Sequence, residues 1–105
     1  MADDICIVMT TVETPEQAKT LARAVIDARL AACAQIVPIS SCYRWEGKVV
    51  EEGEQMMLFK TRADQFAVLE ALLLELHPYD TPEIVRLLAD GVSGKYRDWL
   101  AGEVG

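Results

Sequence analysis

The chain has 105 residues, of which 51% are hydrophobic and 26% charged, a composition that predicts a single globular domain over residues 1–105. Its 17 acidic and 10 basic residues leave a formal charge of −7, which argues against nucleic acid or an anionic membrane as a partner. No apolar run approaches the ~20 residues of a membrane span. Three scattered cysteines exclude a disulfide framework and fit a reducing cytoplasm.

The first third of the chain predicts a strand followed by a helix. An unbroken apolar run at residues 5–9 is typical of a central strand that is buried on both faces. Thr14 and Gln17 have the spacing of a capping box, and Pro15 suits the first helical position. Apolar residues then recur at helical spacing, so we expect a helix from Thr14 to about Ala32.

Residues 34–60 predict a long hairpin. The only turn signal between its two strands is the pair at residues 46–47, Glu-Gly. Pro38 predicts an edge strand or a bulge. The run at residues 51–54, Glu-Glu-Gly-Glu, predicts a solvent-exposed bulge in the returning strand. A hairpin of this length should extend beyond its own sheet.

The last third predicts a helix, a strand and a closing helix. Thr61 is the expected cap of the helix, which ends at Pro78, directly after His77. A strand is expected over residues 83–88, a loop over 91–94 and a short helix over 96–100. The resulting order, β-α-β-β-α-β plus a short C-terminal helix, is that of an α+β, ferredoxin-like split βαβ fold with both helices on one face of an antiparallel sheet.

The residues that could carry chemistry are few. His77 is the only histidine, and neither a nucleophile turn nor a glycine-rich phosphate loop accompanies it, so we do not expect an enzyme. His77 is equally well explained as a metal ligand or as a cap of its helix. Copper(I) prefers cysteine and methionine sulfur, and copper(II) prefers imidazole. Cys33, however, is more simply explained as a small buried hydrophobe.

Aromatic residues predict a protein contact. Trp45 lies beside the expected hairpin tip, where a lone chain has little core to cover it. Tyr43 lies in the same strand, and Trp99 lies in the expected closing helix. Tryptophan and tyrosine are enriched at the centres of protein interfaces. Tyr43, Trp45 and Trp99 are therefore the expected interface residues, although Trp45 could instead fold back on its own sheet.

Five motifs resemble the CutA family of divalent-cation tolerance proteins in order and spacing. They are L-A-A-C at 30–33, Y-R-W-E-G-K at 43–48, L-F-K-T at 58–61, H-P-Y-D-T-P-E at 77–83 and Y-R-D-W-L at 96–100. The resemblance implies a ferredoxin-like subunit in a tight homotrimer. It also implies a cytoplasmic protein of the response to metal ions, linked to copper, with no catalytic reaction and no organic cofactor.

The resemblance also implies a metal site that this chain matches only in part. Family members are credited with copper ligands at a cysteine near the end of the first strand and at the histidine of H-P-Y. Here Met9 occupies the first position, while His77 carries over. The candidate metal residues are therefore His77, Met9 and Cys33.

Two other functions stay open. One is a regulatory module like the trimeric PII signalling proteins, which would bind an anionic metabolite near Arg44, Lys48 or Lys60 in a cleft between subunits. The other is a scaffold that pairs with a different protein through an exposed surface.

Overall fold

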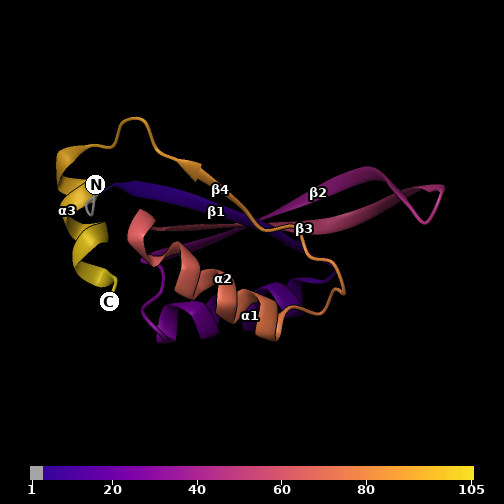
Figure 1. Cartoon of the computed structure of the whole chain (residues 1–105), viewed down its shortest axis with the longest axis horizontal. Helices are drawn as coiled ribbons and strands as arrows, with labels where there is room; N and C mark the ends of the chain where they lie inside the picture. Colours follow the sequence, from indigo (N-terminus) through magenta and orange to yellow (C-terminus); the bar gives the residue numbers. More distant parts are fainter. Residues whose placement is uncertain (1–3) are drawn as a thin grey trace.

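The computed structural model describes residues 4–105. Over this range the elements are β1 (Ile5–Val12), α1 (Pro15–Asp27), β2 (Cys33–Trp45), β3 (Lys48–Arg62), the 3-10 turn η1 (Ala63–Gln65), α2 (Phe66–Leu76), β4 (Val85–Leu88) and α3 (Gly94–Glu103). The strands form one antiparallel sheet in the order β2-β3-β1-β4. Helices α1 and α2 lie together on one side of it (Figure 1). The predicted ferredoxin-like α+β class is confirmed.

Helix α1 begins where the sequence predicts it. The backbone N–H of Gln17 donates to Thr14 Oγ1 (3.1 Å), and the Gln17 side chain accepts from the backbone N–H of Thr14 (3.1 Å). This is a complete capping box with Pro15 at the first helical position.

The sheet has two faces of different character. The helix face carries Val8, Met57 and Phe59, which form the main core with Leu21, Val25, Leu69 and Leu73 of the two helices. Residues at the alternate positions point to the other side, here called the open face. In the register of the strands, the open face includes Ile7, Met9, Val37, Leu58, Val85 and Leu87. Helices α1 and α2 leave this face uncovered.

The hairpin of β2 and β3 gives the molecule its length. It extends well past β1 and β4, and its tip lies at the opposite end from α3 and the C-terminus (Figure 1). The chain measures 44 × 26 × 22 Å along its principal axes. The turn falls at Glu46 and Gly47, both with positive φ, as predicted. Pro38 lies in β2, which is an edge strand.

Two expected boundaries are wrong because long-range hydrogen bonds replace local ones. Helix α1 ends at Asp27 rather than near Ala32, and Arg29 has a φ of 59°. Beyond it, the backbone N–H of Ala32 donates to Lys60 O (2.9 Å). Thr61 does not cap α2: it lies in β3, and its hydroxyl donates to Leu30 O (2.8 Å). The segment that follows α1 is thus held against β3 by these hydrogen bonds.

The expected bulge at residues 51–54 is also wrong. Pairing between β2 and β3 continues without interruption, with Ser40 opposite Gly53 and Ile39 opposite Glu54. Glu54 is buried rather than exposed, with 6% of its surface accessible. A tyrosine from a distant loop covers it, and that contact defines the site described next.

Candidate functional site: a loop that crosses the edge of the sheet

The segment between α2 and β4, residues 77–84, passes from one face of the sheet to the other. Strand β4 pairs with β1 only up to Met9, opposite Val85. Residues 10–12 of β1 therefore have β3 on one side and no strand on the other. The crossing segment runs past this free edge, which gives it one contact on each face.

On the helix face, His77 ties the end of α2 to β1. Its backbone N–H donates to Leu73 O (2.8 Å) as the helix ends. Its ring lies between two polar groups: Nδ1 accepts from the backbone N–H of Tyr79 (3.1 Å), and Nε2 lies 2.9 Å from Thr10 Oγ1. Because Nδ1 is an acceptor, the neutral ring carries its proton on Nε2 and donates to Thr10.

The charge state of His77 follows from this setting. Burial lowers the pKa of its imidazole. The backbone of Thr11 and the negative charge of Glu54 both favour the protonated ring and partly oppose this shift. The ring is therefore neutral at neutral pH, the form that ligates metals. His77 is the C-cap residue of α2, but it caps the helix through its backbone N–H. Its ring contacts Thr10 and the N–H of Tyr79 rather than the last carbonyls of α2.

The three candidate metal residues do not meet within one chain. His77 reaches Thr10 on the helix face, whereas Met9, the next residue along β1, points to the open face. Cys33 also belongs to the open face, but it starts β2 opposite Lys60, two strands away from Met9. Among residues 4–105, no three His, Cys, Asp or Glu side chains are close enough together to hold a metal ion. A site built from all three candidates would need more than one chain.

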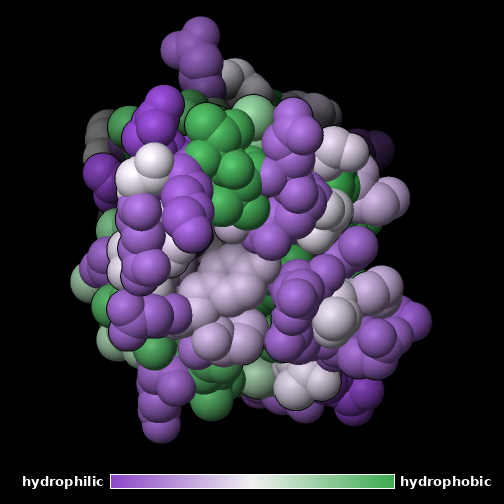
Figure 2. Space-filling model, turned by 90° about the vertical axis from the view of Figure 1, so that its right-hand side faces the viewer, coloured by the Kyte–Doolittle hydropathy of each residue, from purple (hydrophilic) through white to green (hydrophobic). Residues whose placement is uncertain are grey.

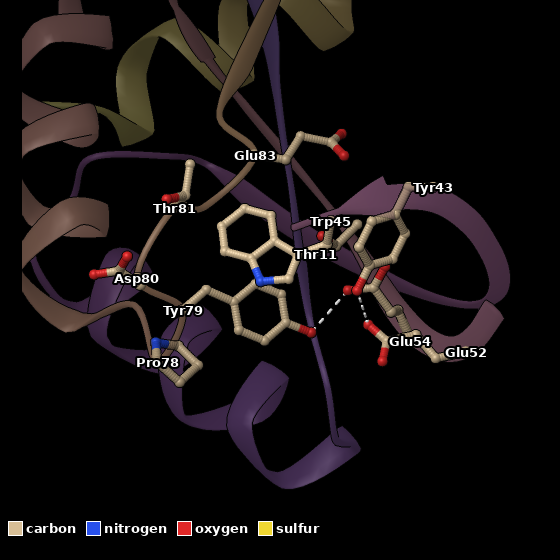
Figure 3. Close-up of a pocket in the computed structure, with 10 residues that line it drawn as sticks. All are labelled: Thr11, Tyr43, Trp45, Glu52, Glu54, Pro78, Tyr79, Asp80, Thr81 and Glu83. Carbon is tan, nitrogen blue, oxygen red and sulfur yellow. Dashed lines mark hydrogen bonds between the residues drawn. The ribbon is translucent and has the colours of Figure 1, made fainter. Parts of the chain in front are cut away.

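On the open face, the crossing segment and the hairpin enclose a cavity of about 460 Å³ (Figure 3), here called the hairpin cavity. Four of its ten lining residues are carboxylates: Glu52, Glu54, Asp80 and Glu83. Three are aromatic: Tyr43, Trp45 and Tyr79. The remaining three are Thr11, Pro78 and Thr81. None of the ten is lysine, arginine or histidine, so the cavity is strongly negative.

Two tyrosine–glutamate hydrogen bonds shape one wall of the hairpin cavity. Tyr79 Oη donates to Glu54 Oε2 (2.7 Å), and Tyr43 Oη donates to Glu52 Oε1. The bond to Glu52 raises the pKa of Tyr43 to about 12. Burial, with the bond to Glu54 second, raises the pKa of Tyr79 as well. Both hydroxyls therefore stay protonated donors throughout the neutral range.

The sequence did not identify this cavity, and only part of its signal was visible. The sequence predicts Glu52 and Glu54 on an exposed bulge, and Tyr79 enters only as part of the H-P-Y motif. The usable clue was Trp45: its side chain is 46% exposed and lines the hairpin cavity. Trp45 is thus partly covered by its own chain.

The remaining predicted residues are not among those that line the hairpin cavity, although Lys48 lies opposite Trp45 in the hairpin. Trp99 is exposed on α3 and stacks against Tyr96, with ring centroids 5.6 Å apart, while Lys60 Nζ lies 5.8 Å from the Tyr96 ring. Arg44 Nη1 contacts Gly47 O at the hairpin tip. Arg44, Lys48 and Lys60, expected to attract an anion, are therefore not part of the hairpin cavity.

The fold and this loop arrangement define an α+β protein with an acidic cavity and a second sheet face that is covered only in part, by α3 at the Ile5 end and by the crossing segment at the hairpin. The family model described as CutA1 divalent ion tolerance protein matches residues 6–103. The chain is 46% identical over 101 residues to the "Divalent-cation tolerance protein CutA" of Thermus thermophilus, with 94% of this chain and 97% of that protein covered. The chain belongs to the CutA1 divalent ion tolerance family.

Solved structures agree with this assignment. CutA from Synechococcus elongatus has a TM-score of 0.95 and 44% identity, covering all of this chain and 93% of that one. A CutA from Archaeoglobus fulgidus, described as a periplasmic divalent cation tolerance protein, has a TM-score of 0.94 and 31% identity, covering 96% and 99%. The Thermus and Archaeoglobus relatives are named for tolerance to divalent cations and not as enzymes.

The inference of a cytoplasmic location is wrong. The Archaeoglobus relative is called periplasmic, and a relative from Arabidopsis thaliana, 41% identical over 90% of this chain, is called chloroplastic. This chain spans 52% of that plant protein. Family membership therefore does not determine the compartment. Within residues 4–105, no helix has the length and apolar character needed to cross a membrane.

Proposed function

We propose that the protein acts in tolerance to divalent cations as a homotrimer that binds copper, without catalysing a reaction, and that residues 1–105 act as one domain. The observation that carries this proposal is the family match over residues 6–103. The copper and the trimer go beyond that match, and each rests on further features of the chain.

The open face supports self-association. Val37, Val85 and Leu87 are large apolar side chains on this face, and Leu87 is 51% exposed. Contiguous exposed apolar surface on a small protein marks an interaction site. Exposed aromatics occur at both ends of the molecule's long axis, with Trp45 near the hairpin tip and Trp99 on α3. Two different patches at opposite ends suit a head-to-tail contact between subunits. Such contacts close into a ring when the rotation that relates one subunit to the next is a whole fraction of a turn.

Light scattering tests the trimer directly. The expected particle has a mass of about 35 kDa, three times the 11.6 kDa of one chain, and this mass should persist on dilution to micromolar concentration. A mass near 11.6 kDa at that concentration would reject the trimer, and a mass near twice that value would replace it with a dimer.

His77 is the residue best suited to contribute to copper binding. It is the only histidine, and its lowered pKa keeps the ring neutral. A metal at Nε2 would replace the proton that now bonds to Thr10, and a lone imidazole needs further ligands for useful affinity. Met9 and Cys33 lie on the open face, so in this proposal any contribution from them comes from another subunit.

The variant His77→Ala separates ligation from structure. Thr10 is fully buried, and it would lose its partner together with the N–H of Tyr79, so the expected loss of stability is about 1–3 kcal/mol. Copper affinity, measured by calorimetry, should fall at least about tenfold, equivalent to about 1.4 kcal/mol.

The matched control is Thr10→Val, which removes the hydrogen bond to Nε2 but keeps the imidazole and its bond from the N–H of Tyr79. It should lose less stability than His77→Ala, because one of the two hydrogen bonds remains. Its copper affinity should equal or exceed that of the wild type because Nε2 is freed. If His77→Ala retains wild-type copper affinity, His77 is a structural residue and not a ligand.

A further inference from the structure

Two residues of the crossing segment, His77 and Tyr79, attach it to both faces of the sheet. Of residues 77–81, these two are half-buried and the other three are exposed. Figure 2, which views the hairpin end of the molecule, shows a pale central surface surrounded by hydrophilic residues. Over residues 77–81 the segment therefore lies on a largely polar surface, where hydrogen bonds rather than apolar packing hold it.

The contacts of these two residues form one continuous chain across the edge of the sheet. On the helix face, His77 Nε2 donates to Thr10 Oγ1 (2.9 Å). His77 Nδ1 accepts from the backbone N–H of Tyr79 (3.1 Å), and the two rings pack with their centroids 5.0 Å apart. On the open face, Tyr79 Oη donates to Glu54 Oε2 (2.7 Å). Thr10 and Glu54 are both buried, so a group left without its partner at either end costs free energy.

These contacts fix the position of the proton on the neutral His77 ring. A neutral imidazole carries one proton and offers its other nitrogen as an acceptor. Because Nδ1 accepts from Tyr79, the proton lies on Nε2. With the proton on Nδ1, two N–H groups would face each other across 3.1 Å, and the backbone of Tyr79 would have to move. The bond from Tyr79 to Glu54 resists that movement.

Metal binding by His77 requires the opposite arrangement. Ligation at Nε2 uses the lone pair of that nitrogen, so the proton of a neutral ring must lie on Nδ1. Ligation at Nδ1 would displace the N–H of Tyr79 directly. In both cases the N–H of Tyr79 loses its acceptor, and the crossing segment has to shift.

We propose that the crossing segment couples the two faces of the sheet: the bond between Tyr79 and Glu54 holds His77 with its proton on Nε2 and thereby opposes metal binding at the ring. Tyr79 and Glu54 are positioning residues of His77. The effect on metal rests on the ligand role proposed above for His77, whereas the effect on the proton does not. Since coupling between two sites is reciprocal, a subunit contact that draws Tyr79 away from Glu54 should raise the copper affinity of His77.

The position of the proton can be measured without metal. His77 is the only histidine, so nitrogen-15 NMR of the metal-free full chain reports its ring alone. At about pH 8 the ring is neutral, and the wild type should carry its proton on Nε2. Tyr79→Phe keeps the aromatic ring and the backbone N–H but removes the hydroxyl that binds Glu54. The fraction of His77 with its proton on Nδ1 should then rise at least about threefold.

The matched control is Tyr43→Phe, which removes the other tyrosine–glutamate bond of the same wall, to Glu52, and leaves the crossing segment unaltered. It should leave the proton of His77 on Nε2. Glu54→Gln weakens the bond from Tyr79 by removing the charge of its acceptor. It should shift the proton in the same direction as Tyr79→Phe, and it tests the coupling if Tyr79→Phe fails to fold. All variants are compared at a chain concentration at which light scattering gives them the same mass.

Copper affinity, measured by calorimetry, gives a second readout. Tyr79→Phe should bind copper at least about threefold more tightly than the wild type, because its crossing segment shifts more easily. A purely structural role of the Tyr79 hydroxyl would lower the affinity instead. Tyr43→Phe should match the wild type within about twofold. In the wild type, copper should also speed hydrogen exchange at the N–H of Tyr79.

The possible failures are distinguishable. An unchanged proton position in Tyr79→Phe, or an equal change in Tyr43→Phe, would overturn the coupling. If His77→Ala loses copper binding but Tyr79→Phe binds copper no more tightly than the wild type, the bond to Glu54 does not oppose metal. If His77→Ala retains wild-type copper affinity, the ligand role of His77 fails, and the NMR measurement still decides whether the two faces are coupled.

Discussion

Replacing Phe59 by alanine is expected to reduce the free energy of unfolding by about 3–5 kcal/mol. Phe59 is fully buried and among the largest side chains of the core. It lies in β3 between Val8 of β1 and Ala34 of β2, where the sheet meets the two helices. Truncation removes apolar contacts and leaves a cavity that the surrounding strands cannot close, because their pairing fixes their spacing.

Urea unfolding at a fixed chain concentration measures this loss, since the stability of an oligomer depends on concentration. The matched control is Val68→Ala, which truncates an exposed apolar residue of α2 and should change stability by no more than about 0.5 kcal/mol. A loss below about 1 kcal/mol in Phe59→Ala would mean that the helices do not pack on this face of the sheet in solution.

Local signals account for the parts of the fold that the sequence predicted. The capping box of Thr14 and Gln17 starts α1, and Glu46 and Gly47 turn the hairpin. Each of these features depends on residues a few positions apart. The order of the elements then leads to the ferredoxin-like sheet, because a split βαβ arrangement has few ways to bury both helices on one face.

Features that depend on distant residues were mispredicted. Thr61 is a good helix cap by sequence, but its hydroxyl donates to Leu30 O instead. Glu54 has the sequence context of an exposed strand edge, yet Tyr79 reaches it from 25 positions away. The hairpin cavity exists only because β4 stops pairing at Met9 and leaves room for the crossing segment. Neither the amino-acid composition nor the spacing of motifs along the chain predicts the residue at which a neighbouring strand stops pairing.

The candidate metal site shows the same limit. The sequence offers His77 as a metal ligand or a helix cap, together with Met9 and Cys33 as candidate ligands. The alternation of side chains along β1 puts Met9 on the other face from Thr10 and therefore from His77. Neighbouring residues of a strand face opposite sides of the sheet. The sequence alone does not show which of the two, Met9 or Thr10, faces His77.

Trp45→Ala is expected to weaken the proposed trimer more than any other substitution at the hairpin tip. In the single chain, 46% of the Trp45 surface remains exposed, while the rest lines the hairpin cavity. If a neighbouring subunit covers that exposed part, its truncation should cost about 2–4 kcal/mol of association free energy, as at other interface hot spots. At a given concentration, the trimer should then dissociate at lower denaturant, or its transition should become dependent on chain concentration.

The matched control for Trp45→Ala is Val49→Ala, in the same hairpin but at an alternate position of β3, where the side chain is 62% exposed. In the register of the hairpin, Trp45 pairs with Lys48, so Val49 points to the opposite side from Trp45 and should leave assembly unchanged. Light scattering and unfolding at two chain concentrations distinguish the variants. If Trp45→Ala retains the mass and the transition of the wild type, the indole serves only the cavity of its own chain, and the contact between subunits must lie along the apolar strands of the open face.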